Sequence, residues 1–192
     1  LPVPFAAEEK IRRELKLKGW GEKEFLLIHS GARWDFKLWP AFRFIRLSQE
    51  LVQKGHKLVF SASKDPSEKK LIRQITETLK PGDYLDLSGS LSLPELGALI
   101  KLSRLLFCMD SLPLHMASAL KVKAVALFGP TQEKLWGPWQ NEKALVLFEN
   151  LSCRPCCQEG CGGSRFCECL YQLKEERVLE ALEKLLETEV FA

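Results

Sequence analysis

The chain has 192 residues, of which 46% are hydrophobic, 28% charged and 9% aromatic, and at roughly 100–200 residues per domain this is the length of one domain. The apolar content excludes an intrinsically disordered chain, and no apolar run approaches the roughly 18 residues that a membrane-spanning helix needs. A formal net charge of +3 is too small to indicate nucleic-acid binding, so no nucleic-acid partner is expected.

The first residues are typical of a linker. Residues 1–4 read Leu-Pro-Val-Pro, and the chain has neither an initiator Met nor a secretion signal, so we expect it to be part of a longer protein. A helix is predicted over 7–18, where apolar residues recur among charges and Gly19 follows. Its five basic residues are a candidate contact with anionic lipid, although its three glutamates favour a solvated face instead.

Short apolar runs alternate with helical patterns along the rest of the chain. Strands are predicted at 25–28, 57–60, 84–87, 105–109 and 124–128, with a further candidate at 144–148, and 25–28 is apolar throughout. Helices are predicted between them from Pro40 to 52 and over 67–79, 94–102 and 113–120, and a closing amphipathic helix over 174–187. The helix that Pro40 opens has a predicted apolar face of Phe42, Ile45, Leu47, Leu51 and Val52.

This alternation predicts the fold class. Runs that are apolar throughout are typical of parallel strands covered on both faces, and strands separated by helices form right-handed crossover units. We therefore predict an α/β protein with a doubly wound, Rossmann-like parallel sheet. A linker and leading helix occupy 1–23, and one domain spans 24–192.

The loop after the first strand is a candidate anion site, because such sheets bind ligands beyond the carboxyl ends of their strands. The loop 29–40 combines small residues, which leave backbone N–H groups accessible, with the cations Arg33 and Lys37, and a helix N-terminus follows. The alternative is a solvated loop that carries two cations. Neither a GxGxxG dinucleotide fingerprint nor a P-loop sequence occurs.

The loops after the fourth and fifth strands carry further candidates. Asp110 either caps the next helix or accepts hydrogen bonds from ligand hydroxyls. Pro113 suits the first turn of that helix, and His115 falls in the same turn, near the positive end of the helix dipole, where a purely structural role is the alternative. Beyond the fifth strand, Trp136 and Trp139 either pack internally or form a wall for a ring.

Taken together, these segments resemble a known family. The stretches 29–40, 110–115 and 128–139 are similar to the donor-domain signatures of the ADP-heptose:lipopolysaccharide heptosyltransferases, glycosyltransferase family 9. The sequence of 93–100, the D-S-x-P-x-H form of the second motif, and F-G-P-T followed by W-G-P-W are most similar to the heptosyltransferase III subgroup. The resemblance runs from about 24 to 186, and its motifs are specific as a set.

The resemblance implies a two-domain enzyme in the GT-B arrangement, of which this chain matches the C-terminal, nucleotide-sugar half. Family members transfer heptose from ADP-heptose to the lipopolysaccharide inner core with inversion, at the cytoplasmic face of the inner membrane of Gram-negative bacteria, and need no metal. Implied partners are the nucleotide sugar, the core acceptor bound by the other domain, and the membrane surface. The catalytic carboxylate lies in that other domain, so the resemblance implies no catalytic residue here and an inactive isolated fragment.

Several donor-binding residues follow from the resemblance by motif. Lys37 looks like the cation that contacts the donor phosphates. Gly31 and Ala32 stand where the family often has hydroxyl residues, so backbone amides would serve there instead. Glu68 resembles the acid that binds the adenosine ribose, with Asp65 as its rival.

The same resemblance assigns five more residues to the donor. They are Leu91, Asp110, Ser111, Pro113 and His115. The backbone of Leu91 matches a position that meets adenine, and Asp110 resembles the acid that holds the heptose hydroxyls. The other three lie at a predicted helix N-terminus that would face the diphosphate.

Six of the seven cysteines crowd into one loop, 153–169, whereas Cys108 lies in an apolar strand and is expected to be a buried thiol. The candidate metal ligands in the loop are Cys153, Cys156, Cys157, Cys161, Cys167 and Cys169. Four thiolates around a structural zinc would fold a loop that lacks its own core, and an iron–sulfur cluster fits the spacing less well. Reduced thiols and disulfides are the alternatives, and a reducing cytoplasm favours the former.

Two other functions remain open at this stage. One is a non-catalytic nucleotide-binding or interaction domain with a metal-stabilised cysteine loop, because a fold does not fix a function. The other is a related transferase that uses another nucleotide sugar, since a few pocket contacts set donor specificity.

Overall fold

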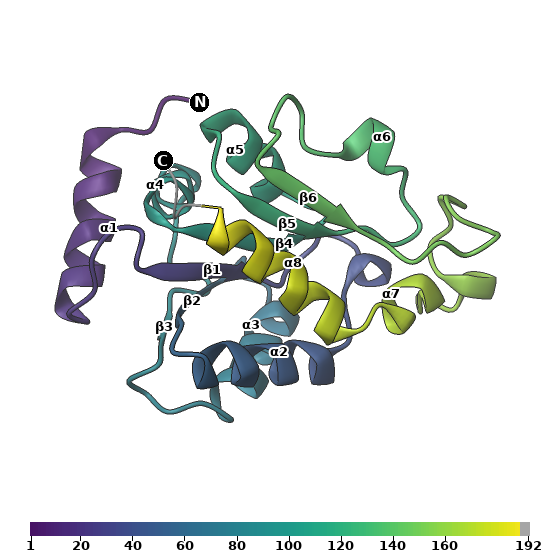
Figure 1. The fold of residues 1–192 in the computed structure, drawn as a ribbon, viewed down its shortest axis with the longest axis horizontal. Coiled ribbons are helices and arrows are strands. Elements are labelled where there is room, and N and C mark those ends of the chain that lie inside the picture. The colour runs from purple at the N-terminus through teal and green to yellow at the C-terminus, as the bar shows by residue number, and fades with distance from the viewer. Residues whose placement is uncertain (189–192) are drawn as a thin grey trace.

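The computed structural model, which describes residues 1–188, contains a parallel sheet with the strand order β3-β2-β1-β4-β5-β6 (Figure 1). All neighbouring pairs are parallel. The strands are β1 (Phe25–His29), β2 (Lys57–Ser61), β3 (Tyr84–Asp86), β4 (Leu105–Met109), β5 (Ala124–Leu127) and β6 (Ala144–Leu147). The order reverses between β1 and β4, as in doubly wound nucleotide-binding sheets, so the predicted fold class is confirmed.

Helices cover both faces of this sheet (Figure 1). The longer helices are α1 (Phe5–Leu17), α2 (Ala41–Gln53), α3 (Pro66–Thr76), α4 (Leu93–Leu102), α5 (Leu112–Leu120) and α8 (Glu175–Glu187). One core lies between the sheet and α2, α3 and α8, and the other lies between the sheet and α1, α4 and α5. Residues 25–28 of β1 are all apolar because both faces of the strand are covered: Leu26 and Ile28 enter the first core, whereas Phe25 and Leu27 enter the second.

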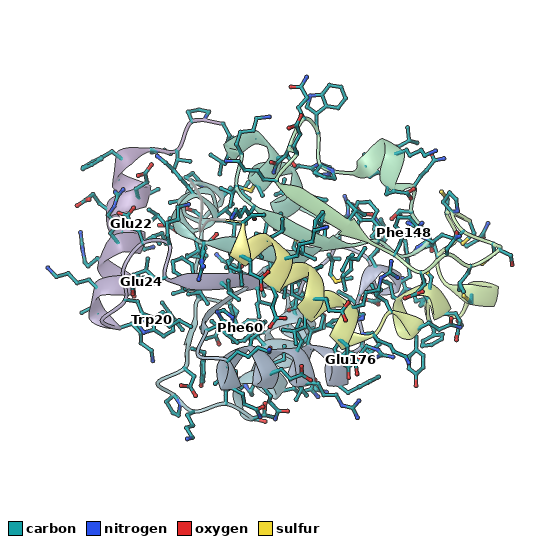
Figure 2. All side chains as sticks on the ribbon, in the orientation of Figure 1. Trp20, Glu22, Glu24, Phe60, Phe148 and Glu176 are labelled. Atoms are coloured by element: carbon teal, nitrogen blue, oxygen red, sulfur yellow. The ribbon has the colours of Figure 1, made fainter. Side chains whose placement is uncertain are left out.

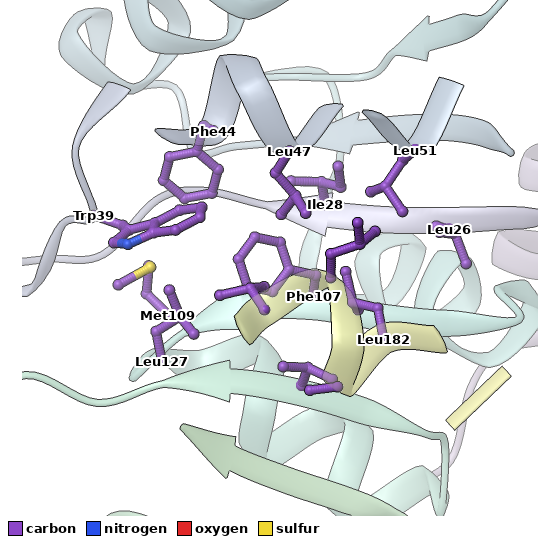
Figure 3. Close-up of a cluster of buried hydrophobic side chains, with 14 of the residues drawn as sticks. Leu26, Ile28, Trp39, Phe44, Leu47, Leu51, Phe107, Met109, Leu127 and Leu182 are labelled. Atoms are coloured by element: carbon purple, nitrogen blue, oxygen red, sulfur yellow. The ribbon is translucent and has the colours of Figure 1, made fainter. Parts of the chain in front are cut away.

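Four of the five residues predicted for the apolar face of α2 contact the first core: Leu47 and Leu51 are buried, and Ile45 and Val52 are partly buried against it. Phe44, Leu47 and Leu51 are buried, at the i, i+3, i+7 spacing of a helix face, and pack with Phe107 and Trp39 (Figure 3). The expected core residue Phe42 instead is 39% exposed. The helix also begins at Ala41, since Pro40 has an extended backbone and occupies the N-cap position.

Short elements that the sequence did not predict complete the chain. They are the 3-10 turns η1 (Asp35–Lys37) and η2 (Cys161–Gly163) and the helices α6 (Glu133–Trp136) and α7 (Glu168–Gln172). Each spans three to five residues, which is too short for an apolar stripe to repeat. Among residues 1–188, no helix combines the length and apolar character needed to cross a bilayer.

The leading helix α1 packs against α4. Ile11 and Leu15 are buried in the second core, and Lys10 Nζ lies 2.7 Å from Glu95 Oε1 in the first turn of α4. Glu95 Oε2 also accepts the backbone N–H of Ser92 at 2.7 Å, as part of a capping box. The helix thus belongs to the same packed unit as the sheet, and the division at residue 23 stays a prediction.

Candidate functional site

A cavity of about 780 Å³ opens at the carboxyl ends of the strands. Its walls come from the loops after β1, β2 and β4, from the start of α4, and from Trp136 of α6. All nine donor-binding candidates line it: Gly31, Ala32, Lys37, Glu68, Leu91, Asp110, Ser111, Pro113 and His115. Residues separated by up to 84 positions in the sequence thus meet in one place, because parallel strands bring their carboxyl ends to the same edge.

Lys37 and Asp110 form an ion pair inside this cavity. The η1 turn presents Lys37 so that its Nζ donates to Asp110 Oδ2 at 2.6 Å, and the two side chains are only 18% and 6% exposed. Thr131 Oγ1 donates to the same oxygen at 2.6 Å. The carboxylate is therefore held from two sides, and it does not cap α5, whose N-cap residue Ser111 has no side-chain capping bond.

Glu68 and Gly31 are in direct contact across the cavity wall. Glu68 Oε2 accepts the backbone N–H of Ser63 at 2.7 Å. A Cβ on Gly31 would stand only 2.4 Å from that same oxygen, so the flexible Glu68 carboxylate would have to turn away from it. A glycine at 31 thus allows the carboxylate to lie against the loop after β1.

Asp65, the rival of Glu68, is used differently. Its Oδ1 accepts hydrogen bonds from the backbone N–H and the hydroxyl of Ser67, at 2.7 and 2.6 Å, and so caps the N-terminus of α3. These two bonds hold the pKa of the Asp65 carboxyl below its usual value. Both acids line the cavity, but Asp65 is exposed and bonded to Ser67, whereas Glu68 is half-buried.

The N-terminus of α5 also reaches the cavity. Ser111, Pro113 and His115 line it from the first turn of this nine-residue helix. Backbone N–H groups in a first helical turn have no acceptor within the helix and carry a partial positive charge. Together with Lys37, this end of the helix makes the region between β1 and β4 suited to an anion.

His29 is a cavity residue that the sequence analysis did not single out. It ends β1, is 8% exposed, and its Nδ1 lies 2.9 Å from Ser61 Oγ at the end of β2. Burial lowers the pKa of His29 to about 4, so the ring is neutral at pH 7. Its position at a strand end could have marked it as a candidate.

The two tryptophans after β5 have different surroundings. Trp136, in α6, lines the cavity and is 56% exposed, whereas Trp139 is 76% exposed and lies outside it. Neither is packed internally. Only Trp136 is placed to act as a wall for a ring.

The cysteine segment contains free thiols. Cys153, Cys157 and Cys161 are exposed and Cys156 is half-buried, whereas Cys167 and Cys169 are buried, as is Cys108 in β4. Burial raises the pKa values of all three buried thiols, that of Cys167 to about 12. Within residues 1–188, no group of three or more His, Cys, Asp or Glu side chains is arranged to hold a metal ion. The candidate structural zinc site is therefore not supported.

Comparison with known proteins adds a family to this geometry. Residues 4–165 match the model of glycosyltransferase family 9 (heptosyltransferase). The chain is 32% identical over 141 residues to lipopolysaccharide heptosyltransferase 3 of Escherichia coli, covering 73% of this chain and 41% of that protein. It is also 32% identical over 188 residues to lipooligosaccharide heptosyltransferase 2 of Campylobacter jejuni, covering 96% of this chain and 57% of that protein.

A solved structure shares the fold. The chain superposes on the Escherichia coli ADP-heptose lipopolysaccharide heptosyltransferase II with a TM-score of 0.77 and 23% identity, covering 98% of this chain and 54% of that one. The chain therefore spans about half the length of the relatives that it matches.

Proposed function

The chain belongs to glycosyltransferase family 9, the heptosyltransferase family, and on that premise we propose that it is the donor-binding half of an inverting enzyme that transfers heptose from ADP-heptose to the lipopolysaccharide inner core. One observation carries the proposal: nine donor-binding candidates, named from the sequence, line a single cavity at the carboxyl edge of the sheet. The relatives' names, which specify heptose transfer to lipopolysaccharide or lipooligosaccharide, support the substrate class.

We assign the diphosphate of the donor to the region between Lys37 and the N-terminus of α5. Cleavage of the sugar–phosphate bond leaves negative charge on ADP, while an oxocarbenium-like sugar develops beside it. A lysine ammonium and oriented backbone N–H groups stabilise such a leaving group most strongly when they are already in place. Lys37 is in place through its bond to Asp110, and Gly31 and Ala32 contribute backbone rather than hydroxyl contacts.

We assign the adenosine to the other side of the cavity. The half-buried carboxylate of Glu68 is the acceptor for ribose hydroxyls, and the backbone of Leu91, just before α4, meets adenine. Since β1 and β2 are neighbours, this arrangement puts the nucleoside and the phosphates on adjacent loops.

Asp110 is assigned to the heptose hydroxyls and not to proton abstraction. An aspartate bonded to both Lys37 and Thr131 is suited to fixing a polar ligand. The general base, the acceptor site and the residues that complete catalysis are proposed to lie in the half of the enzyme that this chain does not contain, so the chain alone is expected to be inactive. We place the whole enzyme in the cytoplasm at the inner membrane, where it contacts the surface peripherally.

Calorimetric titration of the 192-residue chain with ADP, with UDP and GDP as controls, tests the proposal. ADP should bind selectively, and Lys37→Ala should weaken it by about 10-fold to 100-fold, the range for losing a charge-assisted hydrogen bond. Arg33→Ala is the matched control, because Arg33 also lines the cavity but is exposed and stacks on Trp34, and it should change the affinity by less than about threefold.

Thermal unfolding of both variants separates binding from stability, since Lys37→Ala also removes a cation from Asp110. Equal affinity for the three nucleotides would contradict an adenine-nucleotide site. Equal, small losses for the two variants would contradict the role of Lys37.

A further inference from the structure

We infer that Thr131 and Arg154 are positioning residues for Asp110, and that the cysteine-rich segment holds the donor site in shape through them. This inference rests on the proposed function, because it takes Asp110 to be the acid that binds the donor sugar. Neither residue was among the donor-binding candidates. Thr131 lies in the loop 128–133, which follows β5 and faces the loop that carries Asp110. Arg154 is hydrogen-bonded to the backbone of that same loop.

Thr131 fixes the direction of the Asp110 carboxylate. Its Oγ1 donates to Asp110 Oδ2 at 2.6 Å, and Lys37 Nζ donates to the same oxygen at 2.6 Å. Short hydrogen bonds to a charged acceptor are stronger and more directional than neutral ones. With Thr131 removed, Lys37 alone would orient the carboxylate.

Arg154 fixes the loop that carries Thr131. Its Nε donates to the carbonyl oxygen of Gly129 at 2.6 Å, and its Nη2 donates to the carbonyl oxygen of Thr131 at 3.2 Å and to Glu133 Oε2 at 3.0 Å. The side chain is only 4% exposed. Its guanidinium carbon lies 3.9 Å from the ring centroid of Phe148, which Figure 2 labels near the end of β6.

The carbonyl group of Pro130, which lies between those of Gly129 and Thr131, also accepts a hydrogen bond from the cysteine-rich segment. The backbone N–H of Cys157 donates to the carbonyl oxygen of Pro130 at 2.9 Å. Three consecutive carbonyl oxygens, those of Gly129, Pro130 and Thr131, therefore accept hydrogen bonds from residues 154–157. On the other side, a Cβ on Gly129 would stand 2.8 Å from the side chain of Leu170, so α7 closes against the same loop.

In this arrangement the cysteine-rich segment supports the donor site through hydrogen bonds to the loop 128–133, and this support needs no metal. The planar, five-donor guanidinium of Arg154 is needed because the acceptors lie in different directions, and the point charge of a lysine cannot match them. The chain of contacts runs from Arg154 to the loop backbone, from Thr131 to Asp110, and from Asp110 to the donor sugar.

The first test compares two ligands on one variant. Thr131→Val keeps the shape of the side chain and removes its hydroxyl, and it should weaken ADP-heptose about tenfold, the effect of one hydrogen bond to a charged group. ADP lacks the sugar and should bind within about twofold of wild type. Thr131→Ser restores the hydroxyl and should restore ADP-heptose affinity.

The second test follows the loop itself. Arg154→Met, or the milder Arg154→Lys, should weaken ADP-heptose as Thr131→Val does, and should speed amide hydrogen exchange in peptides that cover 129–135. Arg177→Met is the matched control, because Arg177 also bonds a carbonyl oxygen and a carboxylate, those of Phe148 and Glu149. It should change neither measurement.

The outcomes separate the inference from the proposed function. Equal weakening of ADP and ADP-heptose in Thr131→Val, or no weakening of either, would overturn the role of Thr131. Unchanged exchange in both Arg154 variants would overturn the role of Arg154, whether or not a nucleotide binds. If wild type binds neither nucleotide, the proposed function fails and the link to the sugar fails with it, while the exchange result still decides whether Arg154 holds the loop.

Discussion

His29 is kept neutral by its surroundings. It ends a buried strand, its Nδ1 lies 2.9 Å from the hydroxyl of Ser61, and burial lowers its pKa to about 4. A neutral ring at the floor of a cavity assigned to a diphosphate contributes a hydrogen-bonding group and no charge. The positive charge there comes from Lys37 and from the N-terminus of α5.

The low pKa of His29 makes the fold sensitive to acid. As pH falls below about 6.5, the unfolded chain takes up a proton on this ring that the folded chain does not take up until about pH 4, so stability is lost across that interval, by about 3 kcal/mol in full. Urea unfolding of wild type and His29→Asn at pH 7, 5.5 and 4 measures this. The variant should lose less stability between pH 7 and 4, and identical pH profiles would contradict the assignment.

The close neighbour of Gly31 cannot be inferred from the residues next to it in the sequence. A side chain at this position would displace the carboxylate of Glu68, which lies on α3. The sequence shows only a glycine in a loop after a strand. The close approach of the Glu68 carboxylate to Gly31 depends on α3 lying beside the end of β1.

At the scale of elements, the start of α3 carries two acids with different functions. Asp65→Ala removes the cap and should lower the free energy of unfolding by about 1 kcal/mol, with ADP affinity changed by less than about threefold. Glu68→Gln should weaken ADP about tenfold with little change in stability, because the amide oxygen can still accept the Ser63 N–H. Chemical denaturation and calorimetry on the two variants give both quantities. The reverse pattern would make Asp65 the ribose ligand.

The strands and the longer helices could largely be predicted from the sequence, whereas the single-turn helices between them could not. Mostly apolar runs of four or five residues predicted the strands, and apolar residues at helical spacing predicted the longer helices. The turn η1, which brings Lys37 to Asp110, and the helix α6, which brings Trp136 to the cavity, are too short to show a period. The nine cavity residues were named by motif from the family resemblance, and the convergence of strand ends explains why they meet. Thr131 and Arg154 were missed because their roles depend on side-chain hydrogen bonds between separate loops, which no sequence motif shows.

Across the whole molecule, burial in the two cores is expected to separate the cysteine thiols by their rate of alkylation. Thiols exposed to solvent should be alkylated rapidly by iodoacetamide at pH 8, whereas buried thiols with raised pKa values should react only on unfolding. The rapid set is Cys153, Cys157 and Cys161, and the protected set is Cys108, Cys167 and Cys169. Mass spectrometry of the modified peptides at increasing times measures this order. Equal rates across the two sets would contradict the folding of the cysteine-rich segment.

The contact between α1 and α4 links the leading helix to the cavity wall. Lys10 holds Glu95, and Glu95 in turn holds the backbone of Ser92, which lines the cavity beside Leu91. A displacement of α1 relative to α4 would therefore also change the position of Ser92 and Leu91, at the wall assigned to adenine.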